Sequence, residues 1–469
     1  MIRTEISPYL QDNFSPVEAQ ITAHDLSVIG DLPRDLSGTF VRNGPNPQFP
    51  PIGHYSWIDG DGMLHGIQIS NGKAEYRNQY VQTRGFKIEQ KANRAIWTGL
   101  MEPPQLNNPA NNLFSPFKNT ANTALVWHAG RLLALWEGGE PYEIELPGLE
   151  TVGPYTYNGQ LASPFTAHPK VDAVTGEMMF FGYSLLQPPY LRYSVVSAQG
   201  KILRTAPIDL PIGVMMHDFA ITENYTIFMD LPLTFRLERL RRGEPAYMFE
   251  PNSPSRFGIL PRHGDSSSIR WFEVSNCYVL HTLNAYEVGE EIVVIACRAN
   301  DAKTLNIPTK TKLNDSQEDR PILHRWRFHL YTGKVQEETI DDVALEFPSL
   351  NQQWVGKQNR YGYAATMVSG QIPLFTFDGL LKYDFVKGKS QSHKFKPGCY
   401  GGEAVFVPRP SGVQEDDGWL LTFVYDTARK ASELIVVNAQ DLTNEPVANI
   451  LLPRRVPYGF HGTWISEEV

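Results

Sequence analysis

Short runs of apolar or alternating residues, separated by turn-forming residues, recur along the whole chain. Such runs are typical of β-strands when they are rich in Val, Ile, Phe and Tyr. Pairs such as Asn71-Gly72 and Ala129-Gly130 supply the turns of hairpins. The pattern therefore predicts an all-β fold. The clearest runs are Arg131–Glu137, Glu177–Leu186, Tyr225–Leu231, Ile292–Arg298, Trp419–Tyr425 and Ser432–Asn438.

Helical periodicity is scarce, and its best examples, Ser15–Gln20 and Leu237–Gly243, are both short. Many short strands without alternating helices predict a large barrel, a double sandwich or a propeller. No sharp internal repeat is visible. Because the 37 Gly and 35 Pro are spread evenly rather than gathered in a linker, no domain boundary is visible either. We expect one all-β domain over residues 1–469.

Composition and charge narrow the function classes. The chain is 42% hydrophobic and carries a net charge of −9, without a basic block, which disfavours nucleic acid as a partner. Its three cysteines, Cys277, Cys297 and Cys399, form no CxxC motif and fit a reducing compartment. No signal peptide and no apolar run of about 18 residues is present. We expect a cytoplasmic protein, soluble or peripheral on a membrane surface.

The aromatic and glycine-rich stretch Tyr458–Trp464 holds His461 close to the end of the chain. Chain ends are usually frayed and polar, so we expect this stretch to be tied into the body. A lone histidine in apolar surroundings is more often a core residue than a ligand. Three further histidines lie in similar surroundings and favour a metal site instead: His168, His217 and His281.

These four histidines are 49 (217 − 168), 64 (281 − 217) and 180 (461 − 281) residues apart. Local metal motifs place ligands within a few residues of each other, so this set needs a fold that gathers distant strand ends. The spacing leaves His65 open as a ligand. Four neutral imidazoles suit Zn, Cu, Fe or Ni. They leave the ion's charge uncompensated, which favours a redox metal resting as Fe(II), with two octahedral positions open for dioxygen or water.

Carboxylates are expected behind metal-bound imidazoles, because they fix the orientation of the rings. Three apolar segments carry a single acid each, at Glu137, Glu346 and Glu403. A surface carboxylate at a strand end explains each acid equally well when it is taken alone.

Eight motifs, in this order along nearly the whole chain, resemble those of the carotenoid cleavage oxygenases. Within that family the chain looks most similar to the bacterial and cyanobacterial apocarotenoid oxygenases. The motifs are Phe40–Pro47, Trp57–His65, Asn122-Thr123, Trp136–Gly139, Met216–Phe219, Glu346–Pro348, Gly402-Glu403 and Gly459–Gly462.

The resemblance implies a seven-bladed β-propeller capped by a dome of loops and short helices, with one Fe(II) per chain on its axis. By motif, the iron ligands are His168, His217, His281 and His461. Thr123 matches a threonine whose methyl group leans over an open iron position, and His65 is structural. The carboxylates bonded to three of the ligands would be Glu137, Glu346 and Glu403.

The implied reaction is the cleavage by dioxygen of one carbon–carbon double bond in an apolar polyene, a carotenoid or an apocarotenoid. It yields two carbonyl products, retinal-type aldehydes among them. No side chain has to act as acid, base or nucleophile. Specificity would come from a tunnel. Four residues adjoin the ligands or their carboxylates and are candidates to line it, although each fits ordinary core equally well: Trp136, Leu280, Phe347 and Phe460.

Other functions stay open. A related branch cleaves stilbenes such as resveratrol and lignostilbene, and there a lysine precedes the first carboxylate. This chain has Trp136 at that position, which suits a polyene better than a phenolate. A third branch isomerises retinoid esters, and a non-catalytic polyene-binding propeller is a further alternative. For membrane contact, the apolar and arginine-rich Leu231–Arg242 and the segment Asn112–Phe117 are candidates, against loops that pack on their own dome.

Overall fold

The computed structural model describes residues 7–102, 112–242, 244, 247–302, 320–368 and 375–467. The chain forms two compact units. The first comprises residues 1–167, 394–413 and 417–469, and the second comprises residues 168–393 and 414–416. Antiparallel sheets are the main regular structure of each unit, which confirms the all-β prediction. The single domain over residues 1–469 stays a prediction.

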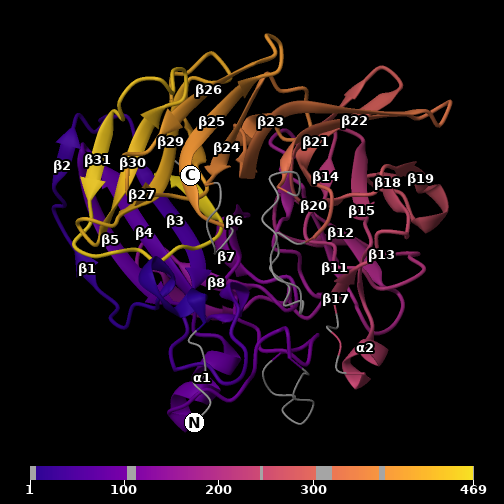
Figure 1. Cartoon of the computed structure of the whole chain (residues 1–469), viewed down its shortest axis with the longest axis horizontal. Coiled ribbons are helices and arrows are strands. Elements are labelled where there is room, and N and C mark those ends of the chain that lie inside the picture. The colour runs from indigo at the N-terminus through magenta and orange to yellow at the C-terminus, as the bar shows by residue number, and fades with distance from the viewer. Residues whose placement is uncertain are drawn as a thin grey trace. The chain divides into compact units, whose positions relative to one another are not determined.

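The first unit contains, within its described residues, sheets of order β1-β5-β4-β3-β32, β6-β7-β8-β9 and β2-β31-β30-β29-β27, with β28 also paired to β29. Strands from the two ends of the chain thus lie side by side, as β2 and β31 do in Figure 1. The strands are β1 Thr22–Ala23, β2 Val28–Gly30, β3 Gly38–Pro45, β4 Gly62–Ser70, β5 Lys73–Tyr80, β6 Ala124–His128, β7 Arg131–Leu135, β8 Tyr142–Glu145, β9 Glu150–Pro154, β27 Cys399–Tyr400, β28 Val405–Pro408, β29 Gly418–Asp426, β30 Ala431–Asn438, β31 Ala448–Leu451 and β32 Gly462–Ser466.

The second unit contains sheets of order β10-β11-β12-β13, β14-β15-β18-β19, β16-β17 and β20 to β26 in sequence order. In the last of these, the long β23 pairs with β22 along its first part and with β24 along its second. The strands are β10 Lys170–Val171, β11 Met178–Tyr183, β12 Leu191–Val196, β13 Ile202–Ile208, β14 Ala220–Ile221, β15 Tyr225–Asp230, β16 Leu233–Phe235, β17 Tyr247–Phe249, β18 Ser255–Pro261, β19 Arg270–Val274, β20 Tyr278–Val288, β21 Glu291–Ala299, β22 Ile322–His329, β23 Val335–Ser349, β24 Tyr361–Met367, β25 Phe377–Asp384 and β26 Lys389–Lys394.

Local sequence explains these strands. Every run of residues expected to be a strand is one, as β7, β11, β15, β21, β29 and β30 show. The continuous apolar run of β21 is buried on both faces, as such runs usually are. Asn71-Gly72 and Ala129-Gly130 have positive φ at both positions, which is the hairpin geometry that their residue types favour.

The helix predictions fare less well. Leu237–Arg241 forms α2, close to the expected bounds. The helix expected over Ser15–Gln20 is wrong, because the backbone there bonds to distant side chains: Val17 N donates to Asn46 Oδ1, and Ala19 O accepts from Asn78 Nδ2. Sequence reasoning also missed α1, Arg84–Ala92, whose first turn is capped by the Thr83 hydroxyl accepting from Phe86 N.

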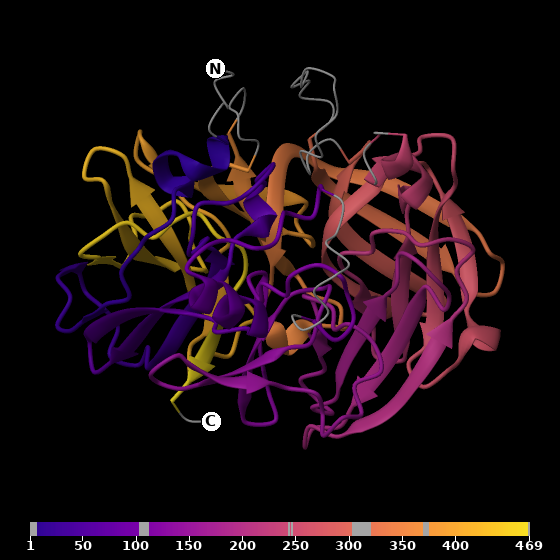
Figure 2. The same ribbon diagram turned by 90° about the horizontal axis from the view of Figure 1, so that it is seen from below.

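The C-terminal stretch is tied into the first unit, as expected. The last strand, β32, pairs with β3 from Gly38↔Ser466 to Arg42↔Gly462. Figure 2 shows this yellow strand beside the indigo strands of the same sheet. The large core of this unit joins β3, β4 and β5 to β29, β30 and β31, with Trp464 of β32 packed against it. Strand pairing therefore fixes the position of the residues just before β32.

The segment expected at a membrane surface is mostly internal. Leu231, Leu233 and Phe235 are buried, so the expectation that Phe235 contacts a bilayer is wrong. Arg239 is buried too, and it bonds to Thr234 and Glu250 within the second unit. Among the residues in the structure's described ranges, no helix is long and apolar enough to cross a membrane. Cys277, Cys297 and Cys399 are buried free thiols, in keeping with the absence of a disulfide framework.

Candidate metal centre

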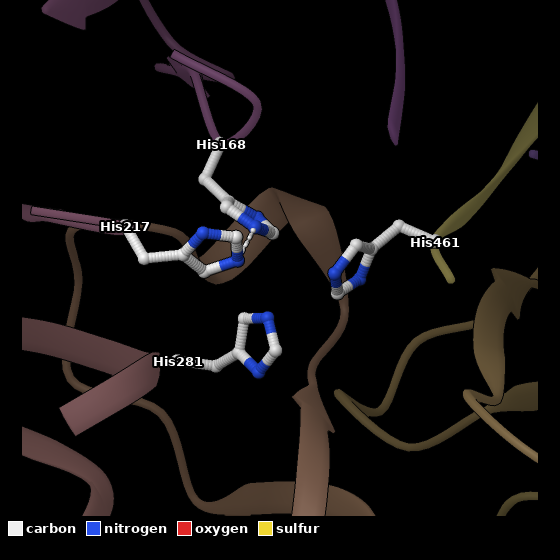
Figure 3. A group of neighbouring side chains, drawn as sticks. All are labelled: His168, His217, His281 and His461. Carbon is white, nitrogen blue, oxygen red and sulfur yellow. Dashed lines mark hydrogen bonds between the residues drawn. The ribbon is translucent and has the colours of Figure 1, made fainter. Parts of the chain in front are cut away.

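The second unit brings three of the predicted histidines together. His168 precedes β10, His217 precedes β14, and His281 lies on β20. Nε2 of His168 and Nε2 of His217 are 3.0 Å apart. The ring centroids are separated by 4.6 Å for His168 and His217, 4.9 Å for His168 and His281, and 5.1 Å for His217 and His281. Three imidazoles that are distant in sequence thus converge on one point (Figure 3).

A buried carboxylate, Asp218, holds the segments that carry these rings. Asp218 Oδ2 accepts hydrogen bonds from Thr282 N and Thr282 Oγ1, both at 2.8 Å. Its Oδ1 lies 2.8 Å from Lys170 Nζ. Burial alone would raise the pKa of Asp218, but Lys170 and these hydrogen bonds lower it below its usual value. Because Asp218, Thr282 and Lys170 adjoin the three histidines in sequence, one carboxylate fixes all three segments.

His281 is also held through its ring. Its Nδ1 lies 2.5 Å from Glu346 Oε2, and the same oxygen accepts a hydrogen bond from Phe347 N at 2.6 Å. Both side chains are almost completely buried. A carboxylate at Nδ1 selects the tautomer with its proton on that nitrogen, which leaves Nε2 as the electron-pair donor. His281 therefore presents Nε2 to a ligand.

The first unit places His461 by a similar contact. His461 Nδ1 lies 2.8 Å from Glu403 Oε1, and Glu403 Oε2 accepts from Gly462 N at 2.6 Å. The backbone of Asn43 bonds on both sides of this ring, since Asn43 N donates to His461 O and Asn43 O accepts from Phe460 N, each at 3.0 Å. The opening motif of the chain therefore positions its final motif.

Arg42, next to Asn43, contacts the same turn before His461. Its guanidinium is buried and donates from Nη2 to Pro457 O at 2.5 Å. Burial lowers the pKa of Arg42 to about 10, although Tyr76 and Glu403 act in the opposite direction. Gly44 is required beside it, because a Cβ there would lie 2.8 Å from the Gly459 Cα. A positive charge and a close backbone approach together fix the turn before His461.

The donor atoms match a metal ion. His168, His217 and His281 of the second unit each offer a ring nitrogen, and these atoms lie within 4.8 Å of one another. At metal–nitrogen distances of about 2.1 Å, ligands at right angles are about 3.0 Å apart, and tetrahedral ligands about 3.4 Å. The separation of 3.0 Å between the Nε2 atoms of His168 and His217 matches the right angle of an octahedral ion. The residues present therefore fit a divalent metal held by imidazole nitrogens.

The other predicted residues lie as follows. Thr123 donates from Oγ1 to Asn122 Oδ1 at 3.0 Å, and its carbonyl accepts from His461 N at 3.2 Å. Glu137 is half-buried after β7, and its contact with a ligand stays a prediction. His65 lies outside the histidine group and bonds through Nδ1 to Tyr76 Oη at 2.9 Å. Burial lowers the pKa of His65 well below its usual value, in keeping with a structural role.

The expected tunnel residues occupy distinct positions. The Phe347 ring lies 5.5 Å from that of His281, at a backbone φ of +54°. Phe460 is buried against Trp57, with ring centroids 4.7 Å apart. Leu280 is half-buried on β20, and Trp136 is buried after β7. Their role in substrate binding stays a prediction.

Known proteins resemble this chain along nearly its whole length. A family profile described as retinal pigment epithelial membrane protein matches residues 14–466. A carotenoid 9,10(9',10')-cleavage dioxygenase of Crocus sativus is 40% identical, over 98% of this chain and 89% of its own length. The chain belongs to the carotenoid cleavage oxygenases. A carotenoid cleavage oxygenase of Mycobacterium tuberculosis is 35% identical, over 98% of this chain and 97% of its own.

Solved structures of the carotenoid cleavage oxygenases agree. A lignostilbene dioxygenase of Pseudomonas brassicacearum aligns with a TM-score of 0.91 and 30% identity, over 98% of each chain. The Synechocystis apocarotenoid oxygenase aligns with a TM-score of 0.85 and 30% identity, over 96% of this chain and 97% of its own. The predicted family and its propeller fold class are confirmed, while the number of seven blades stays a prediction.

Proposed function

We propose that the chain uses dioxygen to cleave one carbon–carbon double bond of a carotenoid or apocarotenoid, giving two carbonyl products. One Fe(II) per chain would be held by His168, His217, His281 and His461. Relatives named as a carotenoid cleavage dioxygenase and a carotenoid cleavage oxygenase support the reaction class. The observation that carries the proposal is the convergence of imidazoles with Nε2 atoms 3.0 Å apart.

When bound, Fe(II) supplies a redox centre that activates dioxygen, and the protein supplies position. Glu346 and Glu403 accept from the Nδ1–H of His281 and His461, so each ring keeps Nε2 directed to the metal. All four ligands are neutral and leave the charge of the ion uncompensated, which favours the divalent over the trivalent state. We assign the same supporting role to Glu137, and to Thr123 the shielding of one open metal position.

The substrate is proposed to be an apolar polyene. Phe347 and Leu280 adjoin the His281 segment and Phe460 precedes His461, so a chain passing the metal would meet apolar surface. Trp136 would add a flat apolar wall. Apolar walls bind a hydrocarbon without orienting it by hydrogen bonds, so the length of the tunnel would select the bond that is cleaved.

Aerobic incubation of iron-loaded protein with apocarotenals, β-carotene and resveratrol tests the proposal, with products resolved by chromatography and mass spectrometry. We expect paired carbonyl products from a carotenoid. His281→Ala should abolish them and lower bound iron, whereas His263→Ala, at an exposed histidine, should change neither. Full iron occupancy without any cleavage would contradict the proposal.

Stilbene cleavage is the second candidate, because the lignostilbene dioxygenase gives a TM-score of 0.91. The buried Trp136 stands where the resemblance expects a phenol-binding lysine in that branch, which favours the polyene. Products from resveratrol alone would assign the protein to the stilbene branch.

A cytoplasmic location with peripheral membrane contact is also proposed, with the contact now limited to exposed side chains. Leu237 of α2 is 39% exposed and Leu113 is 51% exposed. We expect the double substitution Leu113→Ser and Leu237→Ser to reduce flotation with anionic liposomes. A control with Val413→Ser, at another exposed apolar residue, should float like the parent protein. Unchanged flotation of the double variant would reject these two residues.

A further inference from the structure

An N-terminal strap, residues 7–20, lies against the segment that carries His461. The strap contains the short 3-10 helices Pro8–Leu10 and Asp12–Phe14 and precedes β1. The His461 segment is residues 452–461, which connect β31 to β32 without a helix or strand of their own. Both belong to the first unit. Backbone outside helices and strands needs hydrogen-bond partners from elsewhere in the chain, and the strap supplies several of them.

Asn13 of the strap bonds twice to the His461 segment. Its Nδ2 donates to Val456 O at 3.1 Å, and its backbone O accepts from Tyr458 N at 3.0 Å. Asn13 is only 1% exposed, so water does not compete well for these bonds. Loss of the side chain would take a donor from a carbonyl in a place with little access to solvent, which is costly.

Two arginines of the His461 segment bond back to the strap. Arg455 donates from Nη1 to Ser15 O at 2.6 Å and from Nη2 to Pro16 O at 2.7 Å. Arg454 donates from Nη1 to Ala19 O at 2.7 Å. Hydrogen bonds from a charged donor are stronger than those between neutral groups. The strap and the His461 segment therefore hold each other through bonds in both directions.

An aromatic stack joins the strap to the residue before His461. The Phe14 ring centroid lies 4.8 Å from that of Tyr458 and 5.4 Å from that of Trp57. The Trp57 ring in turn lies 4.7 Å from the ring of Phe460. Phe14, Trp57 and Phe460 are all buried. Because a buried ring leaves a cavity when it is removed, loss of Phe14 would loosen the turn that leads to His461.

We propose that the strap positions His461 and is energetically coupled to metal binding, with Asn13 and Phe14 as its positioning residues. The inference rests on the proposed function and goes beyond it, since it gives the first residues of the chain a part in the affinity for the metal. Both residues act through the backbone of the His461 segment rather than by touching the metal or the substrate.

The coupling follows from the equilibrium between a docked and a released strap. Only molecules with a docked strap have His461 in place, so the apparent affinity for the metal falls with the fraction that is docked. Linkage is reciprocal, so a bound metal must favour the docked strap by the same factor. The two effects can be measured separately.

Hydrogen–deuterium exchange of the full-length, metal-free protein, read by mass spectrometry, tests the contact. We expect Phe14→Ala to speed exchange in residues 454–461 about 10-fold or more, and Asn13→Ala about 3-fold. Phe14→Leu keeps much of the apolar volume and should restore most of the protection. Phe86→Ala is the matched control, because Phe86 is 4% exposed against 7% for Phe14 but packs on Tyr80. It should leave residues 454–461 unchanged.

Anaerobic titration with Fe(II), read by metal analysis, tests the coupling. Phe14→Ala should weaken Fe(II) binding about 10-fold, the low end of the loss for groups that support a metal ligand indirectly. Phe86→Ala should bind Fe(II) like the parent protein. In the parent protein, Fe(II) should slow exchange in residues 7–20 and leave exchange in α1 unchanged.

Unchanged exchange of residues 454–461 in Phe14→Ala would overturn the inference. So would an equal increase in Phe86→Ala, which would indicate a general loss of stability, or parental Fe(II) affinity in a Phe14→Ala protein whose exchange is faster. None of these measurements depends on cleavage. Coupling without any cleavage product would reject only the proposed reaction, and cleavage without coupling would reject only the role of the strap.

Discussion

The contacts of His281 in the second unit and His461 in the first use the same chemistry on different backbones. Glu346 and His281 lie on strands of one sheet, and their side chains are 1% and 5% exposed. Glu403 lies in the loop between β27 and β28, and His461 in the segment before β32, with side chains 12% and 10% exposed. Each carboxylate accepts from a ring Nδ1 and from one backbone N–H.

The features that the two contacts share are those that orient the ring, and the contacts differ in how deeply they are buried. In both contacts, a carboxylate that accepts from the ring Nδ1–H and from one backbone N–H orients the ring. This holds whether these groups lie on strands or in loops. Burial decides whether water can take the place of a missing carboxylate. Glu346 is the more completely buried of the two, so we expect water to replace its carboxylate less readily than that of Glu403. The two sites should therefore respond differently to the same substitution.

The largest effect is expected at the carboxylate that ties the second unit's three histidine segments. Asp218→Asn leaves the Lys170 ammonium, whose side chain is 19% exposed, without its ion pair, which should lower the free energy of unfolding by about 3 kcal/mol, the low end of the range for buried pairs. Urea denaturation measures this change. Asp25→Asn removes a carboxylate from the exposed ion pair with Lys73, and it should cost about 1 kcal/mol or less. Equal losses would show that Asp218 has no special role.

The next-largest effect is expected at the two carboxylates that hold histidine rings, Glu346 and Glu403. Glu346→Ala should weaken Fe(II) binding about 100-fold, because the buried Nδ1–H of His281 loses its acceptor, and Glu403→Ala about 10-fold. Anaerobic titration with Fe(II), read by metal analysis, gives both affinities. The Gln variants keep an acceptor oxygen and should recover part of each loss. A larger loss at Glu403 would contradict the role given to burial.

The smallest effect concerns Asp59, a half-buried carboxylate. Burial raises the pKa of Asp59 to about 6, against hydrogen bonds from Leu100 N and Ser56 N. In the folded state Asp59 therefore holds its proton to a higher pH than in the unfolded state. The fold loses stability from this residue as pH rises from about 4 to about 6, by at most about 3 kcal/mol.

Asp59→Asn does not titrate, so its unfolding free energy should improve relative to the parent protein across that window. Urea denaturation of both proteins at a series of pH values measures the difference. A difference that stays constant between pH 4 and pH 7 would exclude the raised pKa. Asp265→Asn, at an exposed residue, serves as the control.

The sequence specifies the local features of this protein. Strand periodicity located β15 and β29, and apolar context together with ordered motifs singled out His461 and its three partners. Local signals failed where they were weak, as over Ser15–Gln20, where the side chains of Asn46 and Asn78 bond the backbone that a helix would use. They also failed where burial depends on distant packing, as at Phe235. Periodicity and motifs act over a few residues, so they report backbone preference well.

Contacts between distant segments come from the folded chain alone. Asp218 was visible within a motif, but its contacts with Lys170 and Thr282 are set by how β20 lies against the loop before β14. Burial and long-range pairing depend on many residues together. For that reason, short stretches of sequence do not encode them.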